Sequence, residues 1–81
     1  MVKSKYTTNP QDWEERIRVM EDNLENCYYD YLYFGIVLNL FDAQDNADYD
    51  KEKVLVAMLS CYKRGNIGAL KKKLNELKEL I

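Results

Sequence analysis

The sequence predicts an all-α fold, and three features of the 81-residue chain indicate it. One proline and three glycines leave few breaks, which favours long regular elements. Apolar residues recur at spacings of three and four, as in amphipathic helices. No hairpin signal accompanies the valine-rich stretch Val54–Val56, where a strand is the only alternative. A chain of this length forms one small domain with a thin stability margin.

The N-terminal end divides into a tail and a helix start. Residues 1–8 lack an apolar period and are expected to form a flexible tail, which leaves residues 9–81 as a single helical domain. Asn9 is a suitable N-cap, and Pro10 suits the first helical position. The first helix is therefore expected to begin near residue 10.

One apolar seam continues from this start for about four heptads. Its spacing predicts a single helix over residues 10–41, roughly 48 Å long at 1.5 Å per residue. A break near Asn26 is the alternative, because asparagine and tyrosine are mediocre helix formers. The seam consists of Trp13, Ile17, Met20, Leu24, Cys27, Tyr31, Phe34, Leu38 and Phe41.

Two shorter helices are predicted to follow, over residues 50–64 and 67–80. Asp48 or Asp50 can cap the first of them, Gly65 fits the position after its end, and Asn66 can cap the second. Together they form an αα-hairpin that packs on the long helix. The fold expected is a three-helix bundle, dimerised through its first helix.

The tyrosine-rich part of the long helix predicts an interface. Beyond Cys27 this helix is apolar on both sides, and two helices of about 22 Å cannot cover both. Tyrosine suits interfaces because it buries a large area and keeps a polar tip. The alternatives are packing within the chain or, with less support, a small-ligand or base-stacking site. The predicted interface consists of Trp13, Ile17, Tyr29, Tyr33, Ile36 and Leu40.

Charge is unevenly distributed, although the net charge is only −2. Residues 9–50 contain eleven acidic and two basic residues, whereas residues 51–81 contain three acidic and eight basic residues. This asymmetry can steer the two halves together or offer separate surfaces to a partner. An acidic partner-binding face is predicted on the first helix, at Asp12, Glu15, Asp22 and Glu25.

The basic third helix supports a different function. Lys71, Lys72 and Lys73 can contact phosphates, and the short glycine-containing turn before this helix is loosely similar to a helix-turn-helix. Three consecutive lysines, however, point in different directions around a helix. A nucleic-acid-binding regulator is therefore the alternative function.

Residues that support catalysis or metal binding are sparse. The chain has no histidine, which excludes Ser-His and Cys-His nucleophiles, and it has no glycine-rich phosphate loop. The stretch NADYDKEKVLVA resembles a calcium loop, but Lys51 and Ala57 occupy the positions that need glycine and glutamate. We expect no enzyme activity, no metal, no cofactor and no small-molecule substrate.

The sequence also lacks the features expected of a secreted or membrane protein. Cys27 and Cys61 do not form a disulfide framework, and no apolar segment is long enough to span a membrane or act as a signal peptide. The sequence therefore predicts a cytoplasmic, non-catalytic protein–protein interaction module that binds itself or another protein. It would act as an adaptor or as a small acidic inhibitor, such as one encoded by a phage or mobile element.

Overall fold

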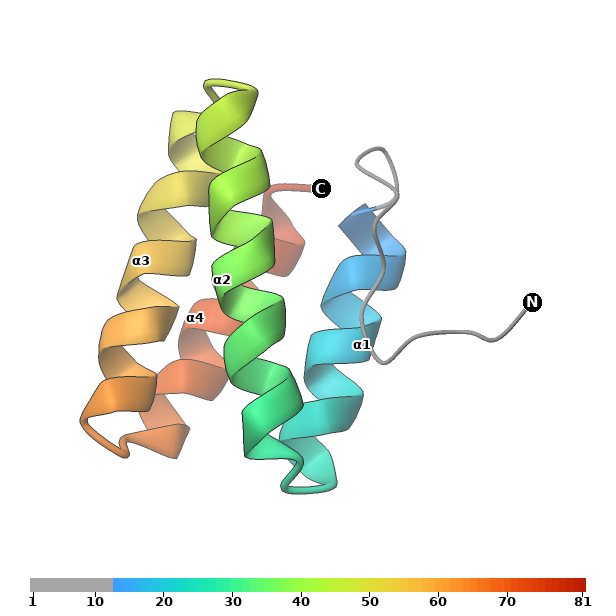
Figure 1. The fold of residues 1–81 in the computed structure, drawn as a ribbon, viewed down its shortest axis with the longest axis vertical. Coiled ribbons are helices and arrows are strands. Elements are labelled where there is room, and N and C mark those ends of the chain that lie inside the picture. The colour runs from blue at the N-terminus through green and yellow to red at the C-terminus, as the bar shows by residue number, and fades with distance from the viewer. Residues whose placement is uncertain (1–12) are drawn as a thin grey trace.

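The computed structural model describes residues 13–81, and this part of the chain forms an antiparallel bundle of four helices (Figure 1). Each helix packs against its neighbours in the chain, and the last also contacts the first. In Figure 1, α2 lies between α3 and α1, with α4 behind it. The helices are α1 (Trp13–Glu25), α2 (Tyr29–Asp45), α3 (Tyr49–Lys63) and α4 (Ile67–Glu79).

The all-α prediction is confirmed, but the prediction of three helices is wrong. The long helix expected over residues 10–41 is two helices, because the chain reverses at Asn26–Tyr28. The alternative of a break near Asn26 is the one observed. The longest dimension is therefore 30 Å rather than about 48 Å. Val54–Val56 lies within α3, which excludes the strand considered there.

The three connections between helices share one local geometry. In each, the second residue after the helix adopts a positive φ: 60° at Cys27, 54° at Ala47 and 70° at Gly65. The next amide nitrogen donates to a carbonyl five residues earlier, as in Tyr28 N to Asn23 O at 2.8 Å. Asp48 N to Ala43 O and Asn66 N to Cys61 O repeat this bond. These are Schellman turns, which end a helix and satisfy its last carbonyls.

The side chains at the turns cap the helices that follow. Asp48 accepts a hydrogen bond from Lys51 N, and Asn66 accepts one from Ala69 N at 3.1 Å. These two caps and the role of Gly65 confirm the sequence predictions. Tyr28 precedes α2 without a side-chain cap, so this helix start relies on backbone bonds and on Asp30 in its first turn.

The turns differ in the conformational free energy of their positive-φ residue, and this difference predicts opposite effects for two substitutions. A residue with a Cβ pays about 1 kcal/mol in the left-handed region, which glycine does not. Ala47→Gly should therefore raise the free energy of unfolding by about 1 kcal/mol, and Gly65→Ala should lower it by about as much. No atom lies within 4 Å of the Cβ that Gly65→Ala adds, so its cost is conformational alone. Urea titrations of both variants test this prediction. Changes in the free energy of unfolding that have the same sign in both variants would contradict it.

The core lies on the inner faces of all four helices. Met20 of α1, Ile36 of α2, Leu55 and Met58 of α3 and Leu70 of α4 are 1% exposed or less. Trp13, Tyr62 and Ile67 pack at its margins. The remaining buried apolar residues are Ile17, Leu24, Leu32, Leu40, Ala43, Leu74 and Leu77.

The seam predicted from sequence is correct in α1 and wrong in α2. Ile17, Met20 and Leu24 are buried as expected. Because the chain reverses at Asn26–Tyr28, the heptad phase does not carry into α2. There the opposite set of residues turns inward, led by Leu32 and Ile36. The predicted seam residues of α2 are left on the outside.

Some predictions fall outside the described residues. The structure does not describe residues 1–12. These residues include the predicted tail over residues 1–8, the predicted helix start at Pro10 and the acidic residue Asp12. Within residues 13–81, no helix combines the length and the apolar character that crossing a membrane requires.

Candidate protein interaction surface

The outer face of α2 carries an uninterrupted row of exposed apolar side chains. Tyr31, Phe34, Leu38 and Phe41, which we call the α2 stripe, are 43%, 52%, 44% and 56% exposed. They follow one another at spacings of three, four and three, so they lie along one side of the helix. No charged residue occurs between positions 31 and 41. This surface is the most apolar one that α2 presents to solvent.

Contacts on both flanks of α2 hold the stripe outward. On the α3 side, the ring of Tyr33 lies 5.4 Å from that of Tyr62, and Gln44 Nε2 donates to Glu52 at 3.1 Å. On the α1 side, Asp42 is paired with Arg16. Leu32, Ile36 and Leu40 fix the inner face. Rotation of α2 to bury its stripe would break all three sets of contacts.

A buried polar network joins α1 to α2. Arg16 is 4% exposed, and its Nη1 lies 2.9 Å from Asn39 Oδ1 and 2.6 Å from Asp42 Oδ2. Asn39 Nδ2 in turn donates to the carbonyl of Gly35 at 2.7 Å. The ring of Trp13 covers the guanidinium at 4.7 Å. A buried charge is tolerated only with such partners, so the network fixes how α1 and α2 align.

Aromatic residues extend the stripe to the first turn. Tyr28 is 46% exposed, and its ring meets that of Tyr31 edge-on at 6.3 Å. Tyr29 O–H donates to Cys27 Sγ at 3.5 Å. This bond and the Coulombic interaction with Cys27 raise the pKa of Tyr29 above its usual value. The Tyr29 hydroxyl presents a polar tip beside the apolar surface.

The structure divides the six residues of the predicted interface. Ile17, Ile36 and Leu40 are core residues at 3%, 0% and 8% exposure, so a second protein cannot reach them while the bundle is folded. Trp13 and Tyr33 are half-buried against the core and α3. Tyr29 alone is exposed. The prediction that this face lacks a partner is wrong, because α1 and α3 cover it once the long helix is folded back.

The charged faces predicted from sequence lie on α1 and α4. Asp22 and Glu25 are exposed on α1, whereas Glu15 is half-buried and paired with Arg18. On α4, Lys71 and Lys72 are exposed, whereas Lys73 lies 3.2 Å from Glu76. Lys78 pairs with Glu21 of α1 at 2.6 Å. Some residues of the acidic face on α1 and of the basic face on α4 therefore form ion pairs within the chain.

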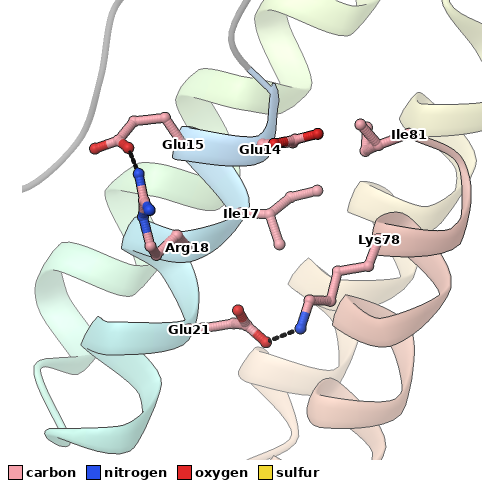
Figure 2. Close-up of a pocket in the computed structure, with 7 residues that line it drawn as sticks. All are labelled: Glu14, Glu15, Ile17, Arg18, Glu21, Lys78 and Ile81. Atoms are coloured by element: carbon pink, nitrogen blue, oxygen red, sulfur yellow. Dashed lines mark hydrogen bonds and ion pairs between the residues drawn. The ribbon is translucent and has the colours of Figure 1, made fainter.

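A groove separates the start of α1 from the end of α4 (Figure 2). It has a volume of about 570 Å³ and is open to solvent. Figure 2 shows the Lys78–Glu21 pair at one end, and Glu14 and Ile81 facing each other at the other end. Ile17 lies on the wall between them. The groove offers mixed charge and little apolar area, so it is a weaker candidate site than the α2 stripe.

The described residues offer no metal site, since no three of their cysteine, aspartate and glutamate side chains are grouped to hold an ion. Phe34, Leu38 and Phe41 belong to the apolar seam that the sequence predicts, so their exposure on the surface was not expected. A search of protein-family models, curated proteins and solved structures finds no match to this chain.

Proposed function

We propose that the chain is a non-catalytic protein–protein interaction module that binds through the α2 stripe. The single observation that supports this is the row of four apolar side chains, each about half exposed, on the outer face of a helix whose rotation is fixed. Soluble domains seldom expose contiguous apolar patches unless the patch binds something. The proposed function is the protein–protein interaction expected from the sequence, but the proposed surface lies on the opposite side of α2 from the predicted one.

The exposed area is large enough to matter energetically. An aromatic side chain presents roughly 200 Å², so five half-exposed residues, the stripe and Tyr28, leave roughly 500 Å² in water. At about 25 cal/mol per Å², covering this area contributes roughly 12 kcal/mol before the cost of association. That cost is about 4–15 kcal/mol, a quantity of the same size, so the area makes association feasible but does not set its affinity.

The surrounding charges are compatible with an adaptor or an acidic inhibitor. The stripe is flanked by Asp30 and Asp45, which precede and follow it on α2. Such a rim favours partners that present basic residues around an apolar patch. The nucleic-acid alternative has weaker support, because two of the four lysines on α4 are paired with glutamates.

This proposal is tested by the size of the complex that the tagged chain forms in an extract of its native cells. Wild type should elute well above its own 9.6 kDa, and Leu38→Glu should elute as the monomer, because a charge in the stripe prevents apolar contact. Leu80→Glu is the matched control, since Leu80 is 41% exposed but lies at the end of α4. If wild type and Leu38→Glu elute at one size, the proposal fails.

A further inference from the structure

We propose that the α2 stripe is occupied by a second copy of this chain, in a two-fold dimer in which the two α2 helices run parallel. This inference rests on the proposed function and names its partner. It depends on three properties: the self-complementarity of the stripe, its area, and the charges of α1 and α3 on either side of α2.

The stripe meets the condition that a two-fold contact imposes. In such a contact each residue near the axis lies against its own copy, so a charge there would meet a like charge. The α2 segment over residues 31–41 has no charge; Asp30 precedes it, and Asp42, which is paired with Arg16, and Asp45 follow it. Leucine and aromatic side chains pack well against themselves. The surface can therefore pair with itself without repulsion at its centre.

The area is that of a small but specific interface. The stripe and Tyr28 contribute roughly 500 Å² per copy and roughly 1,000 Å² per dimer, which reaches the lower limit for specific association. Val56 of α3 is 48% exposed and follows Glu52, which contacts α2, by one helical turn. It therefore lies beside the stripe and adds to the contact.

The charges of α1 and α3 favour one orientation of the two α2 helices in the dimer. α1 and α3 border α2 on opposite sides (Figure 1). In a parallel two-fold dimer α1 of one copy lies over α3 of the other, whereas in an antiparallel dimer α1 lies over α1. α1 has five acidic and two basic residues, and α3 has two acidic and three basic residues. The helices of opposite net charge, α1 at −3 and α3 at +1, therefore lie over each other only in the parallel arrangement.

Cross-linking of single-cysteine variants distinguishes the arrangements. In a background of Cys27→Ser and Cys61→Ala, Tyr31→Cys and Phe41→Cys are each treated with a short bismaleimide, alone and mixed. In the parallel dimer each position lies opposite its own copy, so each variant should cross-link with itself. In an antiparallel dimer centred on the stripe, the two copies of residue 31 lie about 15 Å apart along the axis. Leu80→Cys, at the end of α4, is the matched control and should stay uncrosslinked.

Two results would overturn the inference in different ways. Cross-links that form only between Tyr31→Cys and Phe41→Cys would show an antiparallel dimer and refute the orientation. No cross-link at either position would refute the second copy. In that case, loss of the complex in cell extracts on Leu38→Glu would still support the proposed function with a different partner, and retention of that complex would refute both.

Discussion

Ile36→Ala is expected to lower the free energy of unfolding by about 2–5 kcal/mol, because it opens a cavity in the core. Ile36 is 0% exposed, whereas Leu38, two residues later, is 44% exposed. A domain of this size has roughly 4–12 kcal/mol of stability in total, so the variant should be close to unfolding. Leu38→Ala should cost less than about 1 kcal/mol in the monomer.

Urea denaturation followed by circular dichroism measures both values. Any loss of stability in Leu38→Ala should grow with protein concentration, because the dimer contributes to it, whereas the loss in Ile36→Ala should not. The uninterrupted heptad seam predicts the reverse order, with Leu38 in the core. A larger loss at Leu38 than at Ile36 would therefore contradict the observed rotation of α2.

Asp42→Ala is expected to destabilise the bundle by about 3–5 kcal/mol, because it leaves the charge of Arg16 buried without its carboxylate. The reverse deletion, Arg16→Met, should cost less, about 1–3 kcal/mol, although it leaves Oδ1 of Asn39 and Oδ2 of Asp42 without their partner. The difference arises because the Arg16 side chain is 3% exposed and that of Asp42 is 27% exposed. Asp42 Oδ2 is buried in the pair, but without Arg16 the part-exposed carboxylate can rotate towards water, whereas Arg16 has no such route to solvent.

A double-mutant cycle measures the coupling directly. The variant that combines Arg16→Met with Asp42→Ala should be more stable than Asp42→Ala alone, since no buried charge remains. Thermal or urea unfolding of the three variants and wild type gives the four free energies. Additive losses would show that the two side chains act independently and would refute the network.

Much of the fold could be predicted because the later turns have strong local signals. Asp48 and Asn66 are good capping residues, and Gly65 is the residue that a left-handed turn position favours. The predicted and observed starts of the last two helices differ by at most one residue. These features depend on neighbours in sequence, which is why a sequence shows them.

The first turn was predicted only as the alternative to a continuous helix, because it has no glycine and interrupts an apolar spacing that fits a longer helix. The signal that could have found it is a short internal likeness. NCYYD at residues 26–30 resembles NADYD at residues 46–50, and the second was correctly placed in a turn. In both, the asparagine side chain donates to a carbonyl four residues earlier at 2.8 Å. Asn26 is therefore a helix-ending residue, as Asn46 is.

The interaction surface could not be located once that turn was missed. The tyrosine-rich helix was correctly identified as apolar on both sides. Which side faces the core, however, depends on where the chain reverses and on the pairing of Arg16 with Asp42, 26 positions apart in sequence. Contacts at such separations leave no local pattern. The interface residues were therefore assigned to the side that α1 and α3 cover.

Light scattering from micromolar to hundreds of micromolar protein is the most direct test of the claim that the α2 stripe is a self-association surface. The wild-type molar mass should rise from 9.6 kDa towards twice that value, and Leu38→Glu should remain at 9.6 kDa throughout. Leu80→Glu should follow wild type. A wild-type chain that stays monomeric over the whole range, or a Leu38→Glu variant that dimerises equally well, would contradict the account.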